Sequence, residues 1–139
     1  MYEIIKKECV APNIIYMRLK APKIPLSAKP GQFVIIRVDE KGERIPMGLA
    51  GWDEKEGTID IVFYVLGTST AKLSTLKEGE AVANIAGPLG TPTAVESFGK
   101  VICACGCFGT GPSLPLIKAL KEKGNYVITV VEGRGPDFV

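Results

Sequence analysis

Glycines crowd residues 103–112, "CACGCFGTGP", between an apolar run typical of a strand and a segment typical of a helix. A turn of this kind exposes backbone N–H groups beside the N-terminus of the helix, where phosphate groups bind. Gly106, Gly109, Thr110 and Gly111 are therefore candidate nucleotide-binding residues. A glycine-rich turn alone is weak support, and the strand before it and the helix after it give the pattern its meaning.

Three cysteines in the same stretch could hold a metal ion or an iron–sulfur cluster. Cys103, Cys105 and Cys107 alternate, so an extended strand would point all three thiols to one face. Their spacing is not the C-x2-C of common sites, and residues two apart on a strand are separated by about 6.5 Å. We therefore predict no metal site and interpret the three, like Cys9, as small core residues. A reactive Cys107 thiol beside the helix N-terminus is the alternative.

A second cluster of glycine and hydroxyl residues is Gly67, Thr68, Ser69 and Thr70, "GTST". It opens an expected short helix, Ser69–Leu76, whose first N–H groups could bind a nucleotide phosphate together with the hydroxyls. The same four residues would also serve as an ordinary helix N-cap. From the motif itself, both interpretations stay open.

Composition narrows the classes of function. The 139-residue chain has 17 basic and 15 acidic residues, a net charge of +2 and no basic face, so we expect no nucleic-acid partner. It has no histidine, the commonest general base and metal ligand, and no paired nucleophile and base that would indicate a hydrolase. We expect no membrane span and no signal peptide, and hence a cytoplasmic protein without disulfides. Abundant Lys, Glu and Ile with a single Gln are typical of a thermophile.

Short apolar runs separated by turn residues fill residues 1–98. Their spacing favours an all-β, six-stranded antiparallel barrel. In Thr58–Val65 the alternation of apolar and polar residues gives way to a fully apolar end, as in a strand covered on both faces. Five of these strands can be placed, at Tyr2–Val10, Ile14–Lys20, Phe33–Asp39, Thr58–Val65 and Ala81–Ala86.

The pattern changes after residue 98. Lys100–Cys105 and Tyr126–Val131 are apolar runs on either side of a helical segment, Pro112–Lys123, and together they predict a β-α-β unit with parallel strands. We therefore predict two domains, residues 1–98 and 99–139, the second a partial α/β segment. One helix covers only one face of two apolar strands, so we expect a partner that completes the sheet, either another copy of the chain or a second redox subunit.

Three stretches, taken together, resemble one protein family. They are "KPGQFVIIRVDEKGERIPMGLAGWD" (29–53), "IVFYVLGTSTAKL" (61–73), and "GPLG" (87–90) followed by "GCFGTGPSLPLIKALKEKGN" (106–125). In order and spacing they are similar to the ferredoxin–NADP reductase superfamily. The resemblance is strongest to its flavin- and NAD(P)-binding electron-transfer subunits, those related to dihydroorotate dehydrogenase subunit K and to the small subunit of NADH-dependent ferredoxin:NADP oxidoreductase. It runs through nearly the whole chain.

The resemblance implies that the barrel binds FAD. By this comparison Arg44 neutralises a pyrophosphate oxygen, and Ile45, Pro46, Met47 and Gly48 lie along the isoalloxazine ring. Relatives carry Ser or Thr at the position of Gly48, with a hydroxyl that reaches flavin N5. In this chain only a backbone N–H could approach the ring there.

The resemblance extends the site to further residues. It assigns Val62, Phe63 and Tyr64 to the strand beside the flavin, although Phe and Tyr on a strand also commonly fill a core, and it favours the phosphate role of the "GTST" motif. It puts the glycine turn beside the nicotinamide nucleotide of NAD(P)H, with Cys107 in the place of a glycine. Arg134 falls where relatives carry an arginine near the adenosine ribose.

Two functions follow from this comparison. The first is an FAD-binding electron-transfer oxidoreductase subunit that passes electrons between NAD(P)H, or a partner subunit, and the flavin. The second is a non-catalytic structural module for assembly that keeps the reductase fold without bound flavin. Flavin binding is favoured over NAD(P)H oxidation by this chain alone, because a β-α-β unit lacks much of a nucleotide cleft. The resemblance assigns no catalytic residue.

Overall fold

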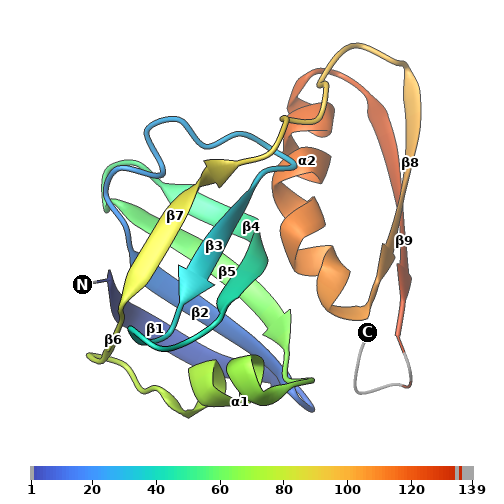
Figure 1. Ribbon diagram of the computed structural model, residues 1–139. Helices are drawn as coiled ribbons and strands as arrows, with labels where there is room; N and C mark the ends of the chain where they lie inside the picture. Colours follow the sequence, from blue (N-terminus) through green and yellow to red (C-terminus); the bar gives the residue numbers. More distant parts are fainter. Residues whose placement is uncertain (1, 134, 136–139) are drawn as a thin grey trace.

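The computed structural model describes residues 2–133 and 135, which form a barrel and an adjoining α/β segment (Figure 1). The barrel is an antiparallel sheet with the strand order β6-β1-β2-β5-β4-β3-β7. β6 and β7 follow each other in the chain but lie at opposite ends of this order, so the sheet curls into a nearly closed barrel. The strands are β1 (Tyr2–Ala11), β2 (Ile14–Lys20), β3 (Phe33–Arg37), β4 (Arg44–Asp53), β5 (Thr58–Tyr64), β6 (Ala81–Val82) and β7 (Asn84–Leu89).

The described barrel has seven strands where the sequence predicts six. The expected strand Ala81–Ala86 is divided into β6 and β7 at Ala83. β4 was not predicted as a strand because Pro46, Gly48 and Gly51 interrupt it, and proline and glycine are depleted inside strands. A proline is tolerated there because the first half of β4 has a neighbouring strand on one side only.

Alternating side chains fill the barrel. In β2, β3 and β5 every second residue points inward, and these residues form one apolar cluster. Its fully buried members include Ile4, Met17, Leu19, Val34, Ile36, Leu49, Ile59, Ile61, Leu73 and Val82. Cys9 is exposed, and the expectation that it belongs to the core was wrong. Cys9 lies in a part of β1, Glu8–Val10, in which every side chain is exposed and none belongs to the barrel core.

The short helix α1 (Thr68–Thr75) closes one end of the barrel, with Leu73 as its buried contact (Figure 1). It begins and ends one residue earlier than expected. Lys7 of β1 donates from Nζ to the carbonyls of Ser74 and Leu76, the latter at 2.8 Å, and so satisfies backbone acceptors at the end of the helix.

The α/β segment consists of β8 (Lys100–Gly106), a 3-10 turn η1 (Cys107–Gly109), α2 (Thr110–Glu122) and β9 (Tyr126–Glu132), with β8 and β9 parallel. The predicted β-α-β unit is confirmed. Asn125 holds its two ends together: its buried side chain accepts from the N–H groups of Phe98 and Gly99 and donates to the carbonyl of Leu120.

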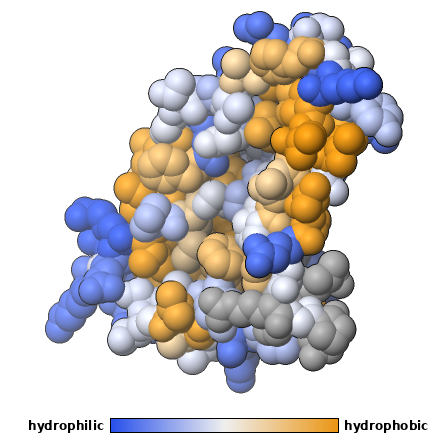
Figure 2. Space-filling view, turned by 90° about the vertical axis from the view of Figure 1, so that its right-hand side faces the viewer, coloured by the Kyte–Doolittle hydropathy of each residue, from blue (hydrophilic) through white to orange (hydrophobic). Residues whose placement is uncertain are grey.

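One face of the β8–β9 sheet packs against α2, and the other is open and apolar. Figure 2 looks onto this side of the molecule and shows apolar side chains gathered over β8 and β9. Ile102 is 69% exposed, Tyr126 65%, Val130 52% and Ile128 43%. The expectation of an uncovered apolar face is therefore correct for the described residues.

Cysteines of the segment do not share one strand face. Cys103 and Cys105 lie on the α2 side of β8, partly and fully buried, whereas Cys107 lies beyond the strand in η1. Among the described residues, no group of His, Cys, Asp or Glu side chains is arranged to hold a metal ion. In the same part of the chain, no helix has the length and apolar character needed to cross a membrane.

Candidate flavin and nucleotide site

β4 changes its partner half-way along its length. Residues 44–48 pair with β3, and the residues from Leu49 on pair with β5. β5 pairs with β4 only up to Ile61, and its residues 62–64 pair with β2 alone. The two strands therefore diverge. We call the opening between residues 44–48 and residues 62–64 the β4/β5 fork.

Predicted site residues line both arms of this fork. By strand alternation, Arg44, Pro46 and Gly48 of β4 lie on the outer face of the barrel, as do Val62 and Tyr64 of β5. On this face Arg44 and Pro46 are exposed, whereas Gly48, Val62 and Tyr64 are half-buried.

Three other predicted residues point the opposite way. Met47 is 7% exposed and Phe63 is 2% exposed, both within the barrel core, and Ile45 packs against that core. Their side chains fill the barrel, and only their backbone groups could contact a ligand on the outer face.

The glycine-rich turn and the start of α2 close one end of the fork. A Cβ atom at Gly48 would lie 2.8 Å from Pro112 Cβ, and a Cβ atom at Gly111 would lie 2.7 Å from Val62 Cβ. Both distances are shorter than side chains tolerate, so the close approach requires glycine at both positions. The turn that the sequence predicts for a nucleotide thus contacts the strands that the resemblance assigns to a flavin.

Aromatic stacking strengthens this junction. The rings of Tyr64 in β5 and Phe108 in η1 are stacked, with centroids 6.2 Å apart and planes inclined by 25°. Together with Gly111 on Val62, this contact covers the outer face of β5. It explains why the end of β5 is apolar at every position, as expected for a strand covered on both faces.

The start of α1 closes the other end. The Ser69 hydroxyl donates to a carboxylate oxygen of Glu43, the residue before Arg44. Lys72, one turn further along α1, pairs with Asp39 in the same β3–β4 hairpin. These contacts hold Arg44 and the Gly67–Thr70 motif side by side.

No family model matches the chain, but curated proteins do. The chain is 40% identical over 137 residues to the dihydroorotate dehydrogenase B (NAD(+)) electron transfer subunit homolog of Thermotoga maritima, covering 99% of this chain and 49% of that protein. It is 37% identical over 115 residues to the corresponding electron transfer subunit of Desulforamulus reducens, covering 80% and 44%. The chain spans about half the length of the curated relatives it matches.

Solved structures decide the fold. A chain of NADH-dependent reduced ferredoxin–NADP oxidoreductase superposes with a TM-score of 0.96 at 40% identity, covering 99% of this chain and 50% of that one. The ferredoxin–NADP+ reductase of Plasmodium falciparum superposes with a TM-score of 0.81 at 11% identity, covering 99% and 60%. The fold is that of the ferredoxin–NADP reductases. The homologues are electron-transfer subunits, and the resemblance noted in the sequence is confirmed.

Within this reductase fold, the absence of a side chain at Gly48 has a packing cause. The ring of Pro112 occupies the space that a serine or threonine side chain would need. The departure from the motif of relatives is therefore coupled to the close docking of α2 on the fork.

At the start of α1, one hydroxyl is committed to the helix itself. Thr70 Oγ1 accepts from the N–H groups of Leu66 and Gly67 at 3.0 and 3.1 Å and donates to the Gly67 carbonyl at 3.0 Å. This is the capping role that the motif also allowed. Ser69, by contrast, turns its hydroxyl to the Glu43 carboxylate, so this helix end already attracts an anion, as its partial positive charge predicts.

The α2 turn offers a second polar position. Thr110 Oγ1 is buried without a hydrogen-bond partner among the described residues, and no side chain caps the helix at Gly109. Cys107 has a φ of 45°, the left-handed conformation that favours glycine, which agrees with the glycine that the resemblance implies at this position. Gly106 is exposed beside it. Arg134, the predicted ribose contact, lies outside the described residues.

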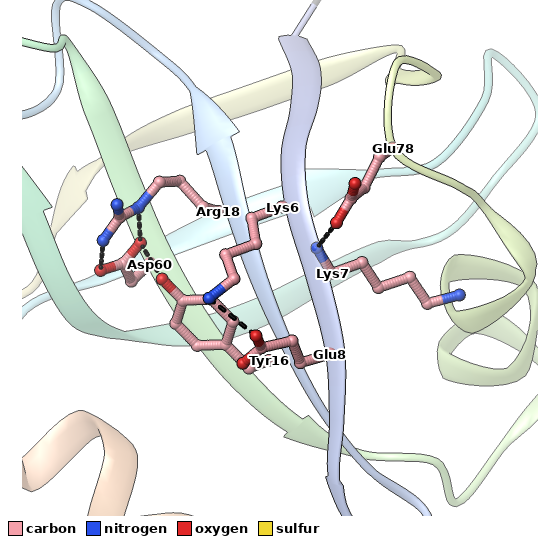
Figure 3. Close-up of polar contacts among 7 residues, drawn as sticks. All are labelled: Lys6, Lys7, Glu8, Tyr16, Arg18, Asp60 and Glu78. Carbon is pink, nitrogen blue, oxygen red and sulfur yellow. Dashed lines mark hydrogen bonds and ion pairs between the residues drawn. The ribbon is translucent and has the colours of Figure 1, made fainter.

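A polar cluster on the outer face of β2 and β5 adjoins the fork (Figure 3). Arg18 makes a two-point contact with Asp60, at 2.7 and 2.9 Å, and Tyr16 donates to the same carboxylate at 2.9 Å. Burial, and then the hydrogen bond and charge of Asp60, raise the pKa of Tyr16 to about 12. Every member has a partner, so the cluster supports the strands rather than a reaction.

Three residues at the fork were not singled out by the sequence: Phe108, Glu43 and Arg37. Each contacts or opposes a predicted residue from another element, so the local sequence carried no sign of it. The exception is Arg37, a charged residue at the end of the apolar strand β3, which a search for unexplained charges in strands would have found.

Proposed function

We propose that this chain is the flavin-binding part of an electron-transfer oxidoreductase subunit, with FAD bound along the β4/β5 fork. The observation that carries the proposal is that two separate predictions, the flavin segments and the nucleotide turn, meet around one fork. FAD would supply the electron-transfer chemistry, accepting and releasing electrons in exchange with NAD(P)H or a partner subunit.

The residues of the fork suit such a ligand. Arg44 offers a guanidinium to a phosphate oxygen, and the N–H groups of Thr68 and Ser69 at the start of α1 point outward from the helix end. The Glu43 carboxylate on Ser69 is a stand-in anion at this position. At the other end, the buried Thr110 hydroxyl without a partner is a donor that a bound group could use.

In this proposal the glycine turn, Gly106 to Gly111, approaches NAD(P)H through its backbone, and the start of α2 faces the nucleotide phosphates. The Tyr64–Phe108 stack would lie beside the junction between the two ligands. The chain thereby orients both ligands, and the cofactors do the redox chemistry.

The test is the absorbance spectrum of the purified protein, followed by acid release and identification of any flavin. We expect a yellow protein that releases FAD, and expect Arg44→Gln to lose flavin while Lys41→Gln, which removes a charge from the nearby hairpin turn, retains it. A colourless protein that does not take up added FAD would refute the proposal.

That second result would favour the other candidate, a non-catalytic assembly module with the reductase fold. The observation in its favour is Gly48, which offers no hydroxyl to a flavin and is packed against Pro112.

We also propose that another polypeptide covers the apolar outer face of β8 and β9, either a second copy of the chain or a second subunit. Support comes from the exposure of Ile102 and Val130, 69% and 52%. Light scattering coupled to size-exclusion chromatography tests for a second copy, and a clean monomer at low concentration would contradict that assignment.

A further inference from the structure

Two arginines form the strand pair next to the turn of the β3–β4 hairpin, beside the α1 end of the fork. Arg37 of β3 and Arg44 of β4 are direct partners in the pairing of the two strands. Both side chains lie on the outer face, because the neighbours Ile36, Val38 and Ile45 face or pack against the core. Directly opposed residues have Cβ atoms about 4.5–5.5 Å apart, and like charges at this separation destabilise a sheet.

No acidic side chain neutralises the pair within residues 2–133 and 135. Neither guanidinium has a carboxylate at ion-pair distance in that part of the chain, and Arg37 Nε is buried there without a hydrogen-bond partner. Two acids that flank the pair are held elsewhere: Asp39 pairs with Lys72, and Glu43 accepts from Ser69. The Lys72 contact, followed by the N–H group of Lys41, lowers the pKa of Asp39, so this carboxylate remains ionised and engaged.

We propose that Arg37 joins Arg44 in binding a phosphate group, and that Arg37 is a binding residue of the site. The inference rests on the proposed function, because the phosphate is taken to belong to the dinucleotide. An anion between the two guanidinium groups turns their repulsion into attraction, and it gives Arg37 Nε an acceptor.

Phosphate is the anion that this arrangement fits. Each guanidinium presents a planar set of donors that matches two phosphate oxygens at once, and two such groups balance the charge of a pyrophosphate. The start of α1 adds N–H donors to the same side, where Glu43 already contacts Ser69. The chain thus supplies its own carboxylate next to the arginine pair.

The test compares Arg37→Gln and Arg37→Lys with Lys41→Gln, a matched loss of charge from the exposed turn of the same hairpin. The probe is inorganic pyrophosphate at constant ionic strength, followed by calorimetry and thermal unfolding; FAD affinity is measured separately by fluorescence. We expect Arg37→Gln to lower the affinity for both ligands by about tenfold or more, because hydrogen bonds to a charged group are lost. Arg37→Lys should fall in between, because it keeps the charge and loses the two-point geometry. Lys41→Gln should bind almost normally.

Each outcome separates this inference from the proposed function. Equal weakening by Arg37→Gln and Lys41→Gln would mean a general charge effect and would overturn the role of Arg37. Arg37-dependent pyrophosphate binding without FAD binding would uphold the arginine site and reject the flavin. Full FAD affinity in both Arg37 variants would uphold the flavin and reject the role of Arg37. If the unaltered protein bound neither ligand, both proposals would be rejected. If Arg37→Gln does not fold, Arg37→Lys provides the comparison.

Discussion

The contact between Gly48 and Pro112 leads to a quantitative prediction. In Gly48→Ala the new Cβ atom would lie 2.8 Å from Pro112 Cβ and 2.9 Å from Pro112 Cγ. Carbon atoms in ordinary contact are about 3.5–4.0 Å apart, so β4 and α2 must separate by about 0.7 Å or more. Pro112 cannot rotate away, because its ring is closed on the backbone.

Overpacking of this kind costs about 1–3 kcal/mol, and replacing a strand glycine by alanine returns about 0.5–1 kcal/mol through the unfolded chain. We therefore expect Gly48→Ala to lower the free energy of unfolding by about 1–2 kcal/mol, measured by urea denaturation. Gly48→Ser, which introduces the hydroxyl that relatives carry, should be destabilised in the same way. Gly106→Ala is the control, since its Cβ atom would meet nothing within 4 Å and its φ of −96° suits alanine.

A double-mutant cycle with Pro112→Gly identifies the cause. Removing the ring should reduce the cost of Gly48→Ala and give a coupling energy of about 1 kcal/mol. A Gly48→Ala variant as stable as the unaltered protein, or additive effects of the two substitutions, would refute the close contact and with it the explanation of Gly48.

Three further predictions concern the fork and its surroundings. Gly111→Ala should lower the free energy of unfolding by about 1–3 kcal/mol, because its Cβ atom would lie 2.7 Å from Val62 Cβ in β5. Gly109→Ala is the control, since its Cβ atom would meet nothing within 4 Å and the free energy of unfolding should change little. Equal effects of the two substitutions would contradict the docking of α2. Glu43→Gln should raise the affinity for pyrophosphate several-fold by removing the competing carboxylate, with Glu40→Gln as the exposed control, and unchanged binding in Glu43→Gln would show that the Ser69 contact does not compete. The raised pKa of Tyr16, from 10.0 to about 12, favours the protonated phenol in the folded state, so its contribution to stability is complete below pH 10 and is lost as the pH rises toward 12. Spectroscopic titration of the tyrosines against Tyr16→Phe measures this pKa, and a normal value would contradict the burial of the hydroxyl beside its carboxylate.

Local patterns predicted most of the elements. The apolar runs of β2, β3 and β5, and the run–helix–run pattern of β8, α2 and β9, each extend over a few residues, so the sequence indicates these elements directly. β4 could not be predicted from a local pattern, because its two halves pair with different strands. Its Pro46 and glycines make sense only once the divergence from β5 is known.

The candidate site was predicted through motifs, and the contacts between motifs were not. Nothing near Gly48 in the sequence indicates Pro112, 64 positions later, and nothing near Ser69 indicates Glu43. The orientation of Met47 and Phe63 into the core also depends on the register of the barrel. These features depend on long-range packing, which a local pattern does not encode.

The docking of α2 uses groups that cannot adjust. On one side of each contact there is no side chain, at Gly48 and Gly111, and on the other there is a proline ring or the β-branched Val62. Proline has a closed ring and valine has few rotamers. The orientation of the turn relative to the barrel is therefore fixed by these contacts. A nicotinamide held by the turn would meet a flavin in the fork at a separation set when the chain folds, without hinge closure to bring the rings together.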